Sequence, residues 1–172
     1  MDHNNLEEIP AGWYRTYTGK LINVINPTAD MICIEDIAHA LAQMPRWAGH
    51  MKKPFTVAQH SLEVMERVED GLKLDALLHD ASEAYLMDIP SPLKKFLPDY
   101  KAIEDNMMKV IAKKFKFEYP LHDDVKKADK DQLDYEWSIM KGEAFRYQGV
   151  IPTSGKTLEC KFIYWFTHYC RI

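Results

Sequence analysis

The sequence predicts an all-α protein with a small N-terminal hairpin. Two observations carry this prediction: apolar residues recur at helical spacing in about five to seven segments, and prolines and glycines separate those segments. The chain has 172 residues, of which 47% are hydrophobic and 28% charged, and this composition is typical of one globular domain. We therefore expect residues 1–172 to form a single helical domain.

The first two predicted elements are the hairpin and a helix. Residues 13–25 place a Thr-Gly-Lys turn at 18–20 between β-branched and aromatic residues, which indicates two short strands. After Pro27, residues 33–44 carry apolar side chains at helical spacing, and Pro45 ends that helix.

The next two helices have equally clear boundaries. Thr56 and Gln59 have the spacing of a capping box, so a helix is predicted to begin after Thr56 and to continue until Gly71. Residues 74–85 carry leucine, alanine and tyrosine at helical spacing, and this helix is expected to end before Pro90.

The remaining helices fill the C-terminal half of the chain. One is predicted over residues 100–114 and a longer one over residues 123–145. Near the C-terminus, an aromatic stripe at helical spacing predicts a last helix that packs in the core or against another subunit. The stripe consists of Phe162, Trp165, Phe166 and Tyr169.

The composition argues against several broad classes of protein. No segment approaches the roughly 18 consecutive apolar residues of a transmembrane helix, and the start, MDHNNLEEIP, lacks the basic and apolar regions of a signal peptide. We therefore expect a cytoplasmic protein with no membrane partner. The three cysteines show no paired spacing, which favours reduced thiols. The net charge of −4 argues against binding to a nucleic acid polymer.

Several ionisable residues occur where the helical pattern predicts burial. His60 lies on or beside the apolar face of the helix that begins after Thr56. His79 and Asp80 follow two leucines within the next predicted helix, and Glu83 lies one turn later. Because residues three or four apart share a helix face, these last three side chains are expected to face the same space.

A further carboxylate interrupts the apolar stripe of the helix predicted over residues 123–145. Asp129 fills a gap four residues from an apolar neighbour on either side. A carboxylate on a core face is costly unless a cation or several hydrogen bonds compensate it. The stripe consists of Val125, Leu133, Trp137, Met140 and Ala144.

Each of these residues taken alone is more often structural than functional, because such groups are usually satisfied by local hydrogen bonds. Taken together, two imidazoles and two carboxylates make a nitrogen and oxygen ligand set for a divalent metal ion such as Co, Mn, Mg, Zn or Fe. Four protein ligands leave open positions on an octahedral ion, as in a catalytic centre. A purely helical scaffold would not explain Asp129.

The order His60, His79-Asp80 and Asp129 resembles the H…HD…D signature of the HD-domain metal-dependent phosphohydrolases. The segments PRWAGH, VAQHSLEV, LLHDASEAYLMDIPSPLKK and VKKAD are similar to the 5′-deoxynucleotidase branch and to phage-encoded dATP triphosphohydrolases, over roughly residues 13–147. The resemblance implies the HD-domain helical fold. It also implies that the metal ligands are His60, His79, Asp80 and Asp129.

The resemblance assigns roles to neighbouring residues as well. Glu83 would orient or deprotonate the attacking water, and Asp88 would act as general acid or position the leaving oxygen. Arg46 would neutralise phosphate charge, and Trp47 would pack on the sugar or the base.

Two further residues complete the expected pocket. Lys94 is a candidate for additional phosphate neutralisation, with a solvated helix start as the equally weighted alternative. His50 is expected to line the same pocket.

The expected activity is hydrolysis of a deoxynucleotide at its α-phosphorus, with dATP or another dNTP as the favoured substrate and a deoxynucleoside and triphosphate as products. A 5′-deoxynucleotidase acting on dNMPs is the alternative, and cleavage of a cyclic nucleotide or an alarmone is less favoured. A non-catalytic nucleotide-binding regulatory module is the alternative of another class. The family tendency and the aromatic stripe predict a homo-oligomer, a dimer or a hexamer. A phage-encoded protein of this kind would act in the host cytoplasm.

Overall fold

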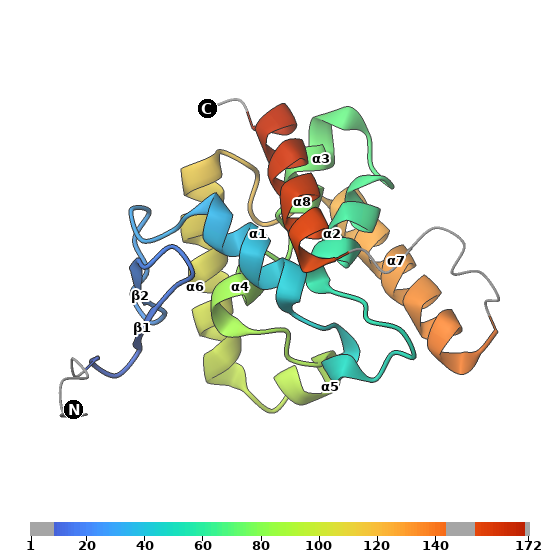
Figure 1. The fold of residues 1–172 in the computed structure, drawn as a ribbon, viewed down its shortest axis with the longest axis horizontal. Coiled ribbons are helices and arrows are strands. Elements are labelled where there is room, and N and C mark those ends of the chain that lie inside the picture. The colour runs from blue at the N-terminus through green and yellow to red at the C-terminus, as the bar shows by residue number, and fades with distance from the viewer. Residues whose placement is uncertain (1–8, 144–153, 171–172) are drawn as a thin grey trace.

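The computed structural model describes residues 9–143 and 154–170. Within those residues the chain forms eight α-helices and one two-stranded antiparallel sheet (Figure 1), so the predicted all-α class with an N-terminal hairpin is confirmed. The helices are α1 (Ile34–Gln43), α2 (Val57–Met65), α3 (Lys73–Leu77), α4 (Glu83–Leu86), α5 (Ser91–Lys94), α6 (Pro98–Phe115), α7 (Asp123–Lys141) and α8 (Gly155–Tyr169), with two short 3-10 helices, η1 (Trp47–Gly49) and η2 (Asp70–Leu72).

The described residues contain more helices than expected because one predicted helix is broken in two and because α5 was not predicted. Residues 74–85 were expected to form a continuous helix, but the chain leaves helical geometry between Leu77 and Glu83. The result is two short helices, α3 and α4, joined by a turn that carries the predicted His-Asp pair.

The hairpin forms where it was predicted. β1 (Trp13–Arg15) pairs antiparallel with β2 (Leu21–Asn23), with Tyr14 opposite Ile22. Gly19 in the connecting turn has a φ of 85°, a conformation that glycine adopts without a Cβ clash.

Hydrogen bonds fasten the hairpin to the helices. Thr18 donates from its backbone N–H and its hydroxyl to Asp36 of α1, at 2.7 and 3.0 Å. Tyr14 donates from its hydroxyl to the backbone oxygen of Tyr85, at 2.8 Å. The hairpin therefore contacts α4, the helix that begins with Glu83.

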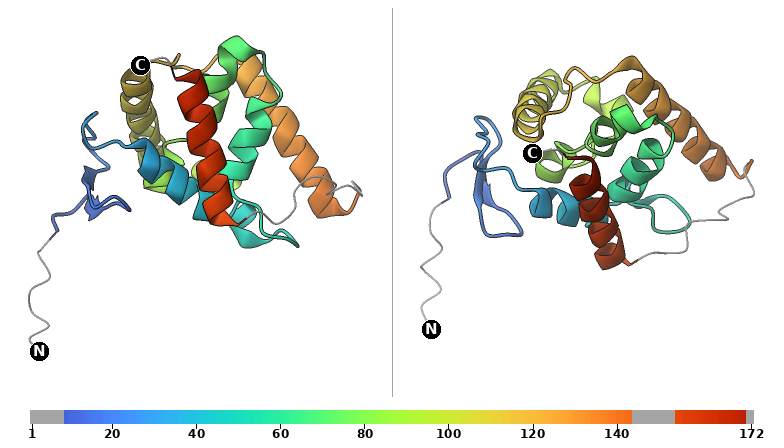
Figure 2. Two further views of the ribbon diagram at one scale, coloured as in Figure 1. Left: turned by 45° about the horizontal axis from the view of Figure 1, so that its top comes forward. Right: turned by 90° about the horizontal axis from the view of Figure 1, so that it is seen from above.

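The core is closed by α8, which packs against α1, α2 and α3 (Figure 1, Figure 2). Phe162 and Phe166 of α8 are buried in it, and Trp165 and Tyr169 pack against it half-buried. The aromatic stripe is therefore part of the core, one of the two roles predicted for it.

Helix α2 begins as predicted and ends earlier than predicted. The Thr56 side chain accepts from the backbone N–H of Gln59, and the Gln59 side chain accepts from the backbone N–H of Thr56, which completes the capping box. The helix ends at Met65, whereas Gly71 lies in the separate turn η2.

Helix α7 buries a different face from the predicted one. Its buried residues are Val125, Ala128, Gln132 and Glu136. Trp137, assigned to the apolar stripe, is 49% exposed. The predicted stripe was therefore wrong at Trp137, and two polar side chains, Gln132 and Glu136, face the interior and find hydrogen-bond partners there. Gly142 caps the helix, and the predicted continuation through Ala144 to residue 145 lies outside the described residues.

None of the described helices has both the length and the apolar character needed to cross a membrane.

Candidate metal centre

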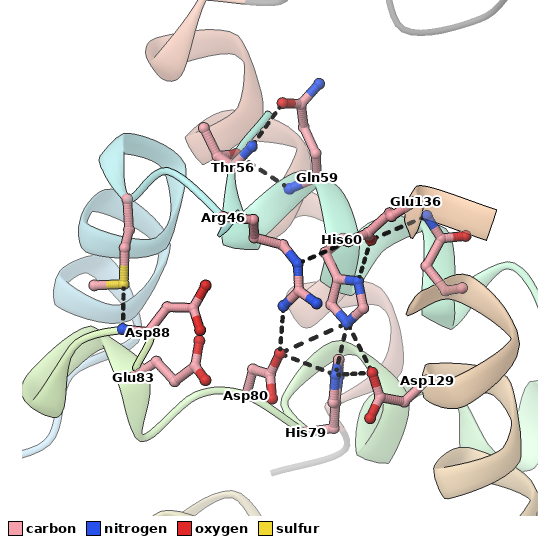
Figure 3. A network of polar contacts seen from close by, with 12 residues as sticks. Arg46, Thr56, Gln59, His60, His79, Asp80, Glu83, Asp88, Asp129 and Glu136 are labelled. Atoms are coloured by element: carbon pink, nitrogen blue, oxygen red, sulfur yellow. Dashed lines mark hydrogen bonds and ion pairs between the residues drawn. The ribbon is translucent and has the colours of Figure 1, made fainter. Parts of the chain in front are cut away.

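The four predicted metal ligands come together in the structure (Figure 3). The Nε2 atoms of His60 and His79 are 3.2 Å apart. Asp129 Oδ1 lies 3.0 Å from the first nitrogen and 3.6 Å from the second. Asp80 Oδ2 lies 3.1 Å from His79 Nε2 and 3.7 Å from His60 Nε2. Ligand atoms of His60, His79 and Asp129 thus lie within 4.8 Å of one another, and Asp80 Oδ2 lies beside the two histidine nitrogens, outside that mutually close group.

The turn between α3 and α4 explains how adjacent residues serve one site. Ala81 donates its backbone N–H to the oxygen of Leu78, and Glu83 donates to that of Asp80, both at 3.0 Å. These tight bonds replace a regular helix, in which neighbouring side chains would point to different faces. The helix expected to carry His79 and Asp80 is therefore absent, and the turn brings both side chains to the centre.

Hydrogen bonds at the far side of each ring fix the histidine tautomers. His60 Nδ1 lies 2.6 Å from Glu136 Oε1, and His79 Nδ1 lies 2.7 Å from the backbone oxygen of Ala76. A carbonyl only accepts, and so does an ionised carboxylate, so both Nδ1 atoms carry hydrogen and donate. In neutral rings both Nε2 lone pairs then face the site, as in metal-ligating histidines.

Charge at the centre requires a cation or bound protons. Burial alone would lower the pKa of His79, but the carboxylates of Asp80 and Asp129 raise it well above its usual value. Burial would raise the pKa of Asp80 and of Asp129, but the two histidines lower both. Two imidazole nitrogens and two carboxylate oxygens suit a divalent ion of the first transition series or Mg²⁺. The residues present therefore fit the implied metal.

Asp129 differs from its predicted environment in one respect. Its side chain is 41% exposed, so it lies at the rim of the core and not within it. The expectation of a carboxylate on the core face was therefore only partly right, because the buried face of α7 is rotated toward Gln132 and Glu136. The exposed side of Asp129 leaves the centre open toward solvent.

Arg46 and Trp47 form the wall beside the centre. Arg46 is buried and donates from Nη1 to Asp80 at 3.4 Å. The Trp47 ring stacks on Trp137 with centroids 5.6 Å apart. A cavity of about 200 Å³ opens next to them. It is lined by Arg46, Trp47, Asp88, Pro90, Ser91, Pro92 and Leu133.

An unusual backbone presents these two side chains. Trp47, Ala48 and Gly49 have φ values of 56°, 49° and 79°, three consecutive residues in the left-handed region. Non-glycine residues adopt this region at a cost of about 1 kcal/mol or more each, and such strain is often found at functional sites.

Comparison with known proteins places the chain in a family. It is 40% identical over 150 residues to "Uncharacterized protein YfdR" of Escherichia coli (strain K12), covering 80% of this chain and 84% of that protein. The chain belongs to the YfdR family. A second relative is "Uncharacterized protein RCAP_rcc00048" of Rhodobacter capsulatus, 34% identical over 128 residues, which cover 69% of this chain and 65% of that protein. A scan against protein-family models gives no match.

In this YfdR-family chain, two acids flank the centre on the side of the cavity. Figure 3 shows the carboxylates of Glu83 and Asp88 close together, facing the space beside Arg46. Glu83 is 4% exposed, and its Oε2 has no hydrogen-bond partner among the described residues. Burial raises its pKa well above the usual value, and the charges of Asp80 and Asp88 raise it further. Burial also raises the pKa of Asp88, although Arg46 opposes that rise.

Lys94 lies within reach of Glu83. Its Nζ is 3.4 Å from Glu83 and 2.7 Å from Glu104 of α6. It is half-buried, so a freely solvated lysine at a helix start, the alternative weighed from the sequence, does not describe it. Lys94 therefore lies where it can contact an anion bound beside Glu83.

His50 is not brought to the centre. It is exposed in the loop after η1, and no hydrogen bond or ion pair among the described residues involves its ring. The structure thus gives no support to the expectation that His50 lines the pocket.

Glu136 is the functional candidate that sequence reasoning missed. It is 1% exposed and accepts hydrogen bonds from His60, Arg46 and Trp47. Its position seven residues after Asp129 places it two helical turns along nearly the same face, a signal present in the sequence. The apolar stripe was instead assigned to its neighbour Trp137, so Glu136 was not among the predicted site residues.

Proposed function

We propose that the protein is a metal-dependent phosphohydrolase of the HD-domain type, acting on deoxynucleotides at the α-phosphorus. The observation that carries this proposal is the convergence of the two His Nε2 atoms with carboxylate oxygens of Asp80 and Asp129, all within 3.7 Å of a histidine nitrogen. A divalent ion held there would act as a Lewis acid and lower the pKa of a bound water.

The neighbouring residues supply the other needs of phosphate-ester hydrolysis. The raised pKa of Glu83 suits a general base that works near neutral pH. Asp88, also with a raised pKa, lies at the cavity wall, where a carboxylic acid can donate to a departing oxygen. Arg46 has donors left beyond its bonds to Asp80 and Glu136, and these can neutralise phosphate charge.

The cavity suits a nucleoside. The indole of Trp47, two prolines and Leu133 give it a mainly apolar lining beside the charged centre. An aromatic ring can pack on a sugar or a base, and Arg46 and Lys94 can hold the phosphate. We favour dATP or another dNTP, on the resemblance to phage triphosphohydrolases, and a 5′-deoxynucleotidase acting on dNMPs is the second candidate. A non-catalytic binding module is less favoured, because both acids are retained.

One assay tests the proposal. The purified protein, loaded with Mn²⁺, Co²⁺ or Mg²⁺, is incubated with a panel of dNMPs and dNTPs, and the release of phosphate, pyrophosphate or triphosphate is measured. We expect hydrolysis by the wild type and strong loss in Glu83→Ala, while Glu69→Ala, an exposed acid in the loop before η2, keeps wild-type activity. Wild-type protein that binds the ions and releases no product from any substrate would contradict the hydrolase proposal and favour the binding module.

Two further proposals concern the oligomeric state and the cellular location. We propose a homo-oligomer, a dimer or a hexamer, which sedimentation of the purified chain tests directly. The proposed substrates are cytoplasmic, so we propose the cytoplasm as the site of action, or the host cytoplasm for a phage-encoded chain.

A further inference from the structure

The carboxylate of Glu136 lies between two groups of residues that the proposed function uses differently. Its Oε1 accepts from His60 Nδ1 at 2.6 Å. Its Oε2 accepts from Arg46 Nε at 3.1 Å and from Trp47 Nε1 at 2.8 Å. One oxygen therefore faces a proposed metal ligand, and the other faces the cavity wall (Figure 3).

The carboxylate is itself held in place. Gln132, one turn earlier on α7, donates to Glu136 Oε1 at 3.3 Å. The Gln132 amide is fixed in turn, because its oxygen accepts two bonds from Arg67, at 2.9 and 2.6 Å, and its nitrogen donates to Glu63. A carboxylate accepts about four hydrogen bonds, so all the acceptor positions of Glu136 are used. It has little freedom to move on one side without losing bonds on the other.

A purely structural role would explain one buried ion pair, but not this choice of partners. A carboxylate that only neutralised Arg46 would not need to select the Nδ1 hydrogen of His60. A carboxylate that only oriented His60 would not need to hold the guanidinium and the indole. Carboxylates behind metal-bound histidines fix ring orientation and raise ligand basicity.

We propose that Glu136 is a positioning residue that couples the metal centre to the Arg46–Trp47 wall of the cavity. The role of the wall in holding substrate rests on the proposed function. The coupling itself does not, because it can be measured through ion affinity alone. Ion binding restrains the His60 ring, which restrains Glu136, which restrains the indole of Trp47. Coupling is reciprocal, so a change at Trp47 alters ion affinity although Trp47 does not contact the ion site.

The Glu136→Gln substitution tests the positioning role, since glutamine keeps the shape and replaces one acceptor with a donor. If the new NH₂ faces His60, the ring must place its hydrogen on Nε2, which removes the lone pair needed by the ion. If it faces Arg46 and Trp47, donor meets donor and the wall is displaced. We expect the Kd for Mn²⁺, measured by calorimetry without nucleotide, to rise about 10- to 100-fold.

The matched control is Asp134→Asn, which removes an exposed carboxylate from the same helix, where it pairs with Lys130. It should leave the Mn²⁺ Kd unchanged. A Glu136→Gln protein that melts like the wild type and binds Mn²⁺ with a Kd within about twofold of the wild-type value would overturn the positioning role. Loss of a residue that hydrogen-bonds to a metal ligand normally weakens metal affinity by more than that.

A double-mutant cycle tests the coupling. Trp47→Phe keeps an aromatic ring and removes the indole N–H that donates to Glu136. We expect Trp47→Phe to weaken Mn²⁺ binding about threefold or more in the wild type, and to have little effect in the Glu136→Gln background. Equal effects in both backgrounds, or none in the wild type, would overturn the coupling.

Two provisions keep the outcome interpretable. If Glu136→Gln does not fold, Glu136→Asp replaces it in the cycle, because it keeps the charge and draws the carboxylate back by one methylene. If the wild type proves active, Glu136→Gln should also raise KM at saturating Mn²⁺, whereas loss of the ion alone would not. Mn²⁺ affinities need no turnover, so failure of the hydrolase proposal and failure of this one are distinguishable.

Discussion

His60 and His79 face each other through Nε2 atoms 3.2 Å apart, while the Nδ1 hydrogen of each ring is committed to an oxygen acceptor. Two neutral rings held in this way would bring two lone pairs together. The contact is favourable only if a proton or a cation lies between the rings. Protons and metal ions therefore compete for the same space.

Metal affinity should rise steeply with pH. The carboxylates of Asp80 and Asp129 raise the pKa of His79 well above its usual value despite its burial, so the ion-free protein should keep that proton to higher pH than an ordinary histidine does. Below that raised pKa each bound ion must displace the proton, and affinity should change about tenfold per pH unit for one proton released. Calorimetry of Mn²⁺ binding in buffers of different ionisation enthalpy measures the released proton. A pH-independent Kd would show that His79 is already neutral.

Asp129→Asn should weaken metal binding more than any change outside the ligand set. The amide keeps the size of the side chain but loses the negative charge that lies 3.0 Å from His60 Nε2. We expect the Kd for Mn²⁺ to rise by more than about 100-fold, which is the upper end of the effect of losing a residue that hydrogen-bonds to a metal ligand. Asp131→Asn, two residues later and paired at the surface with Lys127, is the control. Similar affinities of the two variants would mean that another acid of α7 holds the ion.

Glu83→Gln should lose activity and gain stability. As a general base, Glu83 accounts for about 10²- to 10⁴-fold of the rate. Its folded pKa is raised above the unfolded value of about 4.3, so the folded state binds the proton more tightly and stability declines as pH rises from the unfolded pKa to the folded one. Glutamine does not ionise and escapes this decline.

Urea unfolding at pH 8 should therefore show Glu83→Gln more stable than the wild type, and at pH 4 the difference should shrink. Glu69→Gln, an exposed acid, controls for loss of a carboxylate. A variant that is less stable than the wild type at both pH values would argue that Glu83 is mainly an ion-pair partner of Lys94.

Phe162→Ala should destabilise the fold through α8. Phe162 is fully buried, and removing a buried phenylalanine side chain costs about 3–5 kcal/mol. Tyr164→Ala, on the exposed face of the same helix, should change stability by no more than about 0.5 kcal/mol. If urea unfolding showed equal losses of unfolding free energy in the two variants, the buried face of α8 would contribute no more to stability than its exposed face.

The sequence was sufficient for the fold class because the helices depend on local signals. The capping box at Thr56 and the aromatic spacing in α8 act within a few residues, and both are observed. The break between α3 and α4 was missed because Leu77, Leu78 and Ala81 are all buried, as in a continuous helix. A tight turn with buried residues on both sides has the same apolar spacing as a helix.

The candidate site was harder to predict for a different reason. His60, His79 and Asp129 interrupt apolar surroundings and could be found one by one. Glu136 is explained only by partners 76 to 90 residues away in the chain, His60, Trp47 and Arg46. No local pattern encodes such pairing, so Glu136 was not among the predicted site residues.

The proposed metal ligands lie far apart in the sequence, so they come together at different stages of folding. His60 and His79 are 19 residues apart, whereas Asp129 is 69 residues from His60. The last ligand joins only when α7 docks onto α2, a long-range step with a larger loop-closure cost. A chain that has formed α2 and α3 alone would hold an incomplete set of ligands. Tight ion binding would therefore report that α7 has docked onto α2, a step that does not require α8, the last helix of the chain.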